Sequence, residues 1–202
     1  DYIITNPPFN LKKWRAEDEL TSDPRWSGYE VPPVSNANYA WILHILNKLN
    51  VDTGIAGFLL ANGALDDADP VAIRRKLIEN DKVEAIIMLP REMFYTTDIS
   101  VTLWILNQNK KGGNWHGRNI RNRENEVLFI DLRTWNENVY EKKYVRFSDE
   151  QINKVCEIYH NWQVSASAPV IEQVDGKKGE PQLKFTNPFN MPELYCAVCK
   201  QE

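Results

Sequence analysis

Runs of apolar residues along the chain predict a series of strands. Three of them, at residues 2–5, 55–60 and 83–89, are typical of strands buried on both faces. A further strand is predicted at residues 127–132. Pro90 ends the third run, and another apolar run at residues 100–106 follows after a short loop. Because a parallel connection needs a dozen or more residues, usually with a helix, we expect these two neighbouring strands to be antiparallel.

Segments with helical spacing separate the strands. The first helix is capped by Asn36 or Asn38, the second begins at Pro70, and the third is capped by Ser148 and ends near Trp162. The first helix carries apolar residues at helical intervals: Trp41, Ile42, Ile45, Leu46 and Leu49. Alternation of strands and helices predicts an open α/β sheet, mostly parallel with an antiparallel strand.

Two regions are expected along the chain. Residues 1–147 carry the sheet, and residues 148–202 add a helix followed by a loop or hairpin, with a turn at residues 175–179. The chain has 202 residues, of which 43% are hydrophobic, so it can bury a full core. The first residue, Asp1, already lies at the edge of a predicted strand, so we interpret the chain as a piece of a longer protein.

Composition restricts the function. No apolar run approaches the length of a membrane span, and three cysteines without a paired framework indicate a reducing, cytoplasmic setting. The formal net charge is −4, which argues against a protein that coats nucleic acid without specificity. Any contact with nucleic acid must therefore come from local patches.

The sequence Asn6-Pro7-Pro8-Phe9 directly follows the first predicted strand. A connecting turn would need only one proline or a glycine. Two prolines fix two φ angles and remove two N–H donors, so the neighbouring carbonyls project from a stiff backbone. The Asn6 side-chain oxygen and the Pro7 carbonyl form a rigid pair of acceptors beside the flat ring of Phe9. In open α/β sheets ligands gather at the carboxyl ends of strands, and this pair suits a planar group that carries an NH2.

The tetrapeptide matches the catalytic motif of amino-group methyltransferases that use S-adenosylmethionine. The wider chain resembles the modification (methylation) subunit of type I restriction-modification systems, which are N6-adenine DNA methyltransferases. The resemblance covers about residues 1–162 and consists of an ordered series of segments: DPRW (23–26), SNANYAW (35–41), LANG (60–63), IRRKLIEND (73–81) and FYTTDI (94–99). It implies the S-adenosylmethionine-dependent, Rossmann-like methyltransferase fold.

The resemblance also assigns roles to residues. The catalytic residues would be Asn6, Pro7, Pro8 and Phe9, of which Asn6 and Pro7 would also border the cofactor S-adenosylmethionine. Phe94 or Tyr95 would pack the target base from another side. The implied partners are DNA and the specificity and restriction subunits of a type I complex, with no role for a membrane.

The chemistry of the motif agrees with these roles. An adenine amino group is a poor nucleophile because its lone pair is delocalised into the ring. Two acceptors, on Asn6 and Pro7, can hold both amino hydrogens and draw the nitrogen towards tetrahedral geometry, so positioning and electrostatics replace a strong base. The base must leave the duplex to reach such a pocket. Stacking on Phe9 would return about 1–3 kcal/mol of that energy.

A glycine-rich turn that approaches the cofactor is not visible in this sequence. Gly54 and Gly57 flank the start of a strand, and Gly112-Gly113 sit in a polar loop. In the family that turn lies upstream of the tetrapeptide strand. We therefore expect the chain to be the catalytic half of the methyltransferase sheet, without the main cofactor-binding segment and inactive in isolation.

Two other functions compete with DNA adenine methylation. The same tetrapeptide could serve a methyltransferase for another planar nitrogen, such as a protein glutamine amide or an RNA base. The chain could also be a non-catalytic assembly module that docks on a specificity subunit, with Asn6 merely inherited. The ordered series of type I segments favours the DNA methyltransferase.

Other candidate residues have weaker signals. Residues 110–123 carry Lys110, Lys111, Arg118, Arg121 and Arg123 without one acid; such a run is usually a solvated hairpin loop, and contact with DNA phosphates is the less favoured interpretation.

Further polar positions are predicted to be structural. Cys196 and Cys199 lie on opposite faces if their segment is a strand and share a face if it is a helix. Only one other cysteine exists and no histidine lies near in sequence, so no zinc site, and no other metal site, is predicted. Asn62-Gly63 is predicted to be a turn after the second strand.

Overall fold

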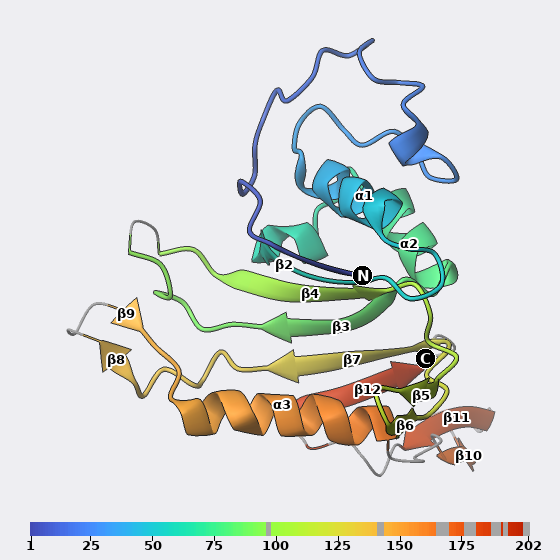
Figure 1. Ribbon diagram of the computed structural model, residues 1–202, viewed down its shortest axis with the longest axis vertical. Coiled ribbons are helices and arrows are strands. Elements are labelled where there is room, and N and C mark those ends of the chain that lie inside the picture. The colour runs from blue at the N-terminus through green and yellow to red at the C-terminus, as the bar shows by residue number, and fades with distance from the viewer. Residues whose placement is uncertain are drawn as a thin grey trace.

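The computed structural model describes residues 1–95, 98–140, 144–164, 170–175, 181–186, 191 and 194–199. A six-stranded sheet in the order β1-β2-β4-β3-β7-β12 forms its centre (Figure 1). The strands of this sheet are β1 (Tyr2–Thr5), β2 (Ile55–Ala61), β3 (Val83–Met88), β4 (Val101–Asn107), β7 (Glu126–Asp131) and β12 (Tyr195–Cys199).

The sheet is mixed, as the sequence predicts. β1 pairs with β2 in parallel, and β3 pairs with β7 in parallel. β4 lies between β2 and β3 and is antiparallel to both, and β12 is antiparallel to β7 at the far edge. Consequently β1, β2, β3 and β7 all run in one direction, and the expectation that the short loop after Pro90 leads to an antiparallel strand is confirmed.

Helices cover both faces of the sheet. The helices are α1 (Asn38–Lys48), α2 (Val71–Glu79) and α3 (Asp149–Val164), with the short 3-10 helices η1 (Pro24–Trp26) and η2 (Asn62–Leu65). Successive strand residues point to opposite faces. Ile86 and Trp104 therefore pack with α1 and α2, whereas Ile87 and Leu103 pack with α3.

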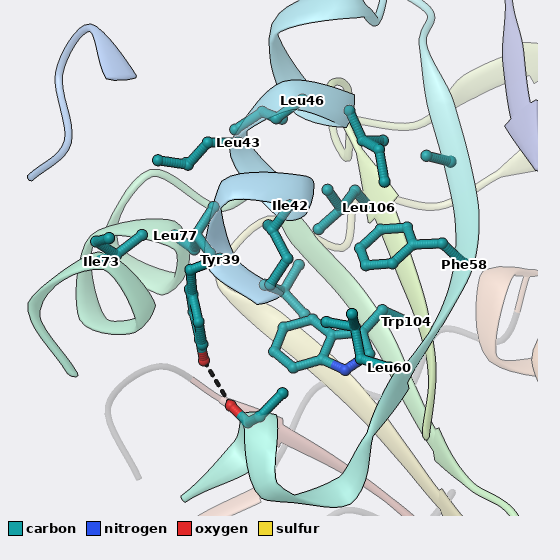
Figure 2. Packing of buried hydrophobic residues seen from close by; sticks show 14 of the residues in the cluster. Tyr39, Ile42, Leu43, Leu46, Phe58, Leu60, Ile73, Leu77, Trp104 and Leu106 are labelled. Carbon is teal, nitrogen blue, oxygen red and sulfur yellow. Dashed lines mark hydrogen bonds between the residues drawn. The ribbon is translucent and has the colours of Figure 1, made fainter. Parts of the chain in front are cut away.

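The larger core cluster gives the tetrapeptide end of the sheet a rigid base. Figure 2 shows Phe58 of β2 and Trp104 of β4 packed beneath α1, and their rings stack with centroids 6.4 Å apart and an interplanar angle of 17°. The Tyr39 hydroxyl donates a hydrogen bond of 2.7 Å to the Ala64 carbonyl and so ties α1 to η2 (Figure 2).

The second core cluster joins residues on both sides of position 147. Ile158 and Trp162 of α3 and Ala197 of β12 are buried against Ile87 and Leu128. Ser148 caps α3 as predicted, because its Oγ accepts the Gln151 N–H (3.2 Å) and the Gln151 Oε1 accepts the Ser148 N–H (3.0 Å). The division into residues 1–147 and 148–202 stays a prediction.

Three small hairpins complete the part of the fold that the structure describes. They are formed by β5 (Gly113–Trp115) with β6 (Arg118–Ile120), β8 (Val139–Tyr140) with β9 (Tyr144–Val145), and β10 (Val170–Asp175) with β11 (Pro181–Thr186). The last one lies within residues 165–190, for which a loop or hairpin is expected, and most of the predicted turn, at residues 176–179, lies outside the described residues. In the part of the chain that the structure describes, no helix is long and apolar enough to cross a membrane.

The expectation that residues 2–5 form a buried strand is wrong for this chain. Ile4 is 89% exposed and Tyr2 is 60% exposed. The physical reason is that β1 is an edge strand with β2 as its one neighbour in the described sheet. On the face that α3 shares, Tyr2 and Ile4 line an apolar groove of about 720 Å³ together with Gly57, Leu103 and Ile105.

Candidate functional site

The parallel strands direct four connections to one edge of the sheet. The tetrapeptide follows β1, η2 follows β2, residues 89–100 follow β3, and residues 132–148 follow β7. In Figure 1 this carboxyl edge lies on the left, where β8 and β9 are also found. The edge is where ligands of open α/β sheets bind.

Asn6 and Pro7 present two oxygen atoms at this edge. Thr5 is still paired with Phe58 of β2, so the strand anchors the start of the motif. Asn6 is exposed and Pro7 is buried. Among the described residues, no donor is hydrogen-bonded to the Asn6 side-chain oxygen or to the Pro7 carbonyl. Neither acceptor is therefore occupied by another described residue.

The structure brings Phe94 to Phe9. The two rings lie edge to face, with centroids 5.8 Å apart and an interplanar angle of 77°, and both side chains are half-buried. The loop between β3 and β4 thus supplies a second aromatic residue beside the tetrapeptide. The assignment of both rings to a base pocket is a proposal that this proximity supports.

Tyr95 points to solvent and is held by a residue that sequence reasoning missed. Its side chain is 70% exposed, and its ring lies 4.2 Å from that of Tyr144 in β9. The Tyr144 hydroxyl donates to the Tyr95 carbonyl (3.2 Å), and the Val145 N–H donates to the Glu92 carbonyl (2.9 Å). The β8–β9 hairpin thereby braces the loop that carries Phe94. Nothing in the local sequence pattern signals this contact across 49 positions.

Asn62 and Gly63 begin η2, so the predicted turn after β2 is a 3-10 helix. The Asn62 N–H donates to the Ser100 carbonyl (3.0 Å), which links η2 to the start of β4. The Asn62 Oδ1 atom is buried and has no hydrogen-bond partner among the described residues.

The basic stretch at residues 110–123 lies at the opposite edge of the sheet. β4 runs antiparallel, so its last residue, Asn107, pairs with Ile55 at the start of β2. The β5–β6 hairpin follows from there, and in Figure 1 it lies on the right, away from β8 and β9. The stretch is a hairpin, as its composition favoured, and it is remote from the tetrapeptide.

Three of the five basic residues in this stretch are engaged inside the fold. Lys110 is 2% exposed and its ammonium group donates to Asp81 Oδ1 (2.6 Å) and to the Val83 carbonyl (3.0 Å). Arg123 is 2% exposed and pairs with the buried Glu84 (3.2 Å).

Arg121 is the third of these residues. It forms a two-pronged pair with Glu126 at 2.7 and 2.8 Å. The less favoured interpretation, contact with DNA phosphates, is therefore not supported for Lys110, Arg121 and Arg123, because carboxylates and carbonyls of the fold already occupy them. Lys111 and Arg118 are exposed, and their contact with DNA stays a prediction.

Cys196 and Cys199 lie on the edge strand β12, which selects the strand among the two interpretations. An offset of three places them on opposite faces of the sheet. Among the residues that the structure describes, no group of three or more histidine, cysteine, aspartate or glutamate side chains could hold a metal ion.

Asn6 and Pro7 are the described residues that could border one end of S-adenosylmethionine. The unpaired acceptors of Asn6 and Pro7 at the carboxyl end of β1 can border a methyl donor and the amino group that receives the methyl. No described strand of the sheet is followed directly by a glycine-rich turn that could hold the remainder of such a cofactor.

Comparisons with known proteins agree with this geometry. The profile of the N-6 DNA methylase family matches residues 1–186. The chain is 39% identical over 169 residues to the type I restriction enzyme HindI methylase subunit of Haemophilus influenzae, covering 82% of this chain and 34% of that protein. It is 32% identical over 168 residues to the MjaIX methylase subunit of Methanocaldococcus jannaschii, covering 81% and 28%.

Solved structures show the same fold. The methyltransferase subunit of a type I restriction-modification system from Streptococcus thermophilus superimposes with a TM-score of 0.66 and 28% identity, covering 87% of this chain and 32% of that one. The M protein of the EcoKI type I restriction enzyme superimposes with a TM-score of 0.53 at 17% identity, covering 93% and 40%, which concerns the fold alone.

The chain spans about a third of the length of the curated relatives described above. The family match covers residues 1–186, which include the tetrapeptide at the carboxyl edge of the sheet. The chain belongs to the N-6 DNA methylase family.

Proposed function

We propose that the protein to which this chain belongs is the modification subunit of a type I restriction-modification complex. It transfers a methyl group from S-adenosylmethionine to N6 of an adenine that has been flipped out of DNA. The observation that carries the proposal is the pair of unengaged acceptors, Asn6 Oδ1 and the Pro7 carbonyl, beside the Phe9 and Phe94 rings in a chain of this family.

The residues of the chain act by positioning. Asn6 and Pro7 accept the two hydrogens of the adenine amino group, and this directs the nitrogen lone pair away from the ring. Asn6 is neutral, so it orients the amino group without taking a full charge from it. Phe9 offers a face for stacking, and Phe94, nearly perpendicular to it, closes a second side of the base. S-adenosylmethionine, when bound, supplies an electrophilic methyl group.

The main cofactor-binding segment is a separate part of this proposal. We place it outside residues 1–202 in the longer protein, beside β1. The exposed edge of β1 and the apolar groove lined by Tyr2 and Ile4 support this arrangement, because apolar side chains of that size are normally covered. Residues 1–202 in isolation would therefore not catalyse methyl transfer.

The proposed partners follow from the same family. DNA is the substrate, a specificity subunit selects the sequence to be methylated, and a restriction subunit completes the complex. The support is that both curated relatives described above carry the name of type I methylase subunits. Because its substrate is the DNA of the cell, we place the protein in the cytoplasm.

The proposal is tested by finding where the methyl group goes. The full-length protein, co-expressed with the specificity subunit of its own system, is incubated with labelled S-adenosylmethionine and with DNA, RNA and protein acceptors in separate reactions. The DNA is then digested to nucleosides. Label in N6-methyladenine is the expected result. Label in a protein glutamine or in RNA would support the competing methyltransferase class, and an absence of transfer to all three would favour an assembly role.

A further inference from the structure

The residue after the tetrapeptide is held by a buried asparagine from α1. Asn38, the first residue of α1, is 2% exposed. Its Oδ1 accepts the backbone N–H of Asn10 (3.1 Å), and its Nδ2 donates to the Asn10 Oδ1 (2.9 Å). Buried side-chain amides are almost always satisfied in this way. The two hydrogen bonds fix both the backbone and the side chain of Asn10.

A third asparagine completes the arrangement. The Asn36 Nδ2 also donates to the Asn10 Oδ1 (3.2 Å), and the Asn36 Oδ1 accepts the N–H of Asn38 (2.9 Å). Beside them the Ala37 N–H donates to the Leu11 carbonyl (2.9 Å). We call Asn10, Asn36 and Asn38 the asparagine cluster. It joins the exit of the tetrapeptide to the beginning of α1, across 26 to 28 positions of sequence.

The cluster restrains the part of the turn that the prolines leave free. β1 is paired with β2, and Pro7 and Pro8 have fixed φ angles, so the entry to the turn is stiff. Phe9 and Asn10 have no such restraint. Asn10 adopts a φ of 52°, a left-handed conformation that asparagine tolerates better than most residues. Its hydrogen bonds to the cluster hold this conformation.

Asn38, at the other end of the cluster, begins a helix that packs into the hydrophobic core. Tyr39 and Ile42, which follow Asn38 in α1, are 1% and 0% exposed, so α1 is a fixed reference for the cluster. Asn10 itself is exposed at the surface. The buried helix thus determines the position of an exposed residue adjacent to Phe9.

We propose that the asparagine cluster is a positioning device for the methyl-transfer site. By fixing Asn10 it sets where the Phe9 ring lies relative to the Asn6 and Pro7 acceptors and to the incoming base. This inference rests on the proposed function. None of the three asparagines is required to touch the substrate, so they act through the tetrapeptide. Because a misplacement of 1 Å can reduce a rate about a hundredfold, loss of this restraint should affect the chemical step.

Two substitutions at Asn10 test the proposal in the full-length protein assembled with its specificity subunit. Asn10→Asp keeps an oxygen that can accept from Asn36 and Asn38, whereas Asn10→Ala removes it. We expect Asn10→Ala to lower kcat by about tenfold to hundredfold, with the KM for DNA and the Kd for S-adenosylmethionine near those of the wild type. Asn10→Asp should keep most of the wild-type kcat. Since Asn10 is exposed, both variants should fold.

A matched control separates positioning from stability. The Asn50 Oδ1 accepts the backbone N–H groups of Asp52 and Thr53 (3.0 Å each) in the turn that precedes β2, at the edge opposite the tetrapeptide. Asn50→Ala should therefore lower the melting temperature without lowering kcat. If Asn10→Ala and Asn50→Ala both lowered the melting temperature and both lowered kcat to the same extent, the effect at Asn10 would be structural and the inference would be wrong.

The remaining outcomes distinguish a failure of this inference from a failure of the proposed function on which it rests. Suppose that the wild type methylates DNA. If Asn10→Ala is then as active as the wild type, or if Asn10→Asp is as inactive as Asn10→Ala, the inference is wrong and the proposed function is unaffected. A wild-type protein that transfers no methyl group to DNA overturns the proposed function, and the inference with it.

Discussion

Phe9 could act as a stacking surface for the target base or as a core residue, and these two roles predict different effects of substitution. It is half-buried and contacts the Phe94 ring edge to face. If it is a stacking plate, Phe9→Ala should lose about 1–3 kcal/mol of stabilisation of the extruded adenine, a tenfold to hundredfold effect. Phe9→Trp should keep part of the activity, because a larger ring still offers a π face. Methylation of matched duplexes by both variants gives the measurement.

The same variants on mismatched duplexes provide the control for Phe9. Extrusion costs less energy when the target adenine faces a mismatch, so the defect of Phe9→Ala should shrink there. A core phenylalanine would behave differently, because its alanine variant would lose about 3–5 kcal/mol of folding stability. Early melting of Phe9→Ala together with indifference to the mismatch would contradict the stacking role.

Asp23 gives a prediction of pH dependence. Hydrogen bonds from the Arg25 guanidinium and backbone N–H lower the pKa of Asp23 from 3.8 to about 2, and the same guanidinium lies 4.8 Å from the centroid of the Trp26 ring. A carboxyl whose folded-state pKa is lowered contributes stability above its unfolded pKa, and that contribution disappears as the pH falls towards its folded pKa.

Denaturation of the wild type and Asp23→Asn over a range of pH measures this contribution. The wild type should be the more stable protein above about pH 4, by a constant margin, and the margin should shrink between about pH 4 and pH 2. A margin that stays constant down to pH 2 would show that the charge of Asp23 does not stabilise the fold.

At the scale of elements, the β5–β6 hairpin is attached to the sheet by Lys110. Its ammonium group is enclosed by Asp81 and by the carbonyls of Val83 and Glu126. Lys110→Met leaves these groups without their donor and should destabilise the protein by about 3 kcal/mol. Lys111→Met, next to it and exposed, should change stability by no more than about 0.5 kcal/mol. Chemical denaturation of both variants checks this pair.

DNA binding by the same variants decides between structure and recognition for this hairpin. A lysine that neutralises a phosphate contributes close to one unit to the slope of log affinity against log salt. Because Lys110 is buried, the slope for folded Lys110→Met should equal that of the wild type. A reduced slope for Lys110→Met, with unchanged stability, would instead show that Lys110 contacts a DNA phosphate.

The element pattern was predictable because it depends on local periodicity. The apolar runs predicted β2, β3, β4 and β7, and the Ser148 cap placed the start of α3. The burial of the Lys110 side chain was not predictable, since it depends on an ion pair with Asp81, 29 positions away. For the same reason the brace of Tyr144 on the loop that carries Phe94 has no sequence signal. The exposure of β1 was not predictable, because an apolar run shows that a strand has side chains suited to burial. It does not show which strands or helices lie beside that strand.

At the scale of the whole molecule, the proposed catalytic edge and the main cofactor-binding segment belong to different parts of the longer protein. Residues 1–202 alone should bind S-adenosylmethionine weakly or not at all, whereas the full-length protein should bind it. The reason is that, in the proposed function, Asn6 and Pro7 would border only the methyl end of the cofactor. Isothermal titration calorimetry on both proteins makes the comparison. Micromolar binding by residues 1–202 would place the main cofactor site within this chain and refute the proposed division.

The central claim, that the exposed amide of Asn6 orients the adenine amino group, is tested most directly by Asn6→Ala in the full-length protein. Asn6 has no hydrogen-bond partner for its side chain among the described residues, so the substitution should leave the melting temperature and the affinity for S-adenosylmethionine near wild type. The measurement is the rate of methyl transfer to adenine N6 in DNA. We expect Asn6→Ala to lower kcat by at least about a hundredfold. Retention of more than about a tenth of the wild-type kcat, with folding and cofactor binding intact, would contradict it.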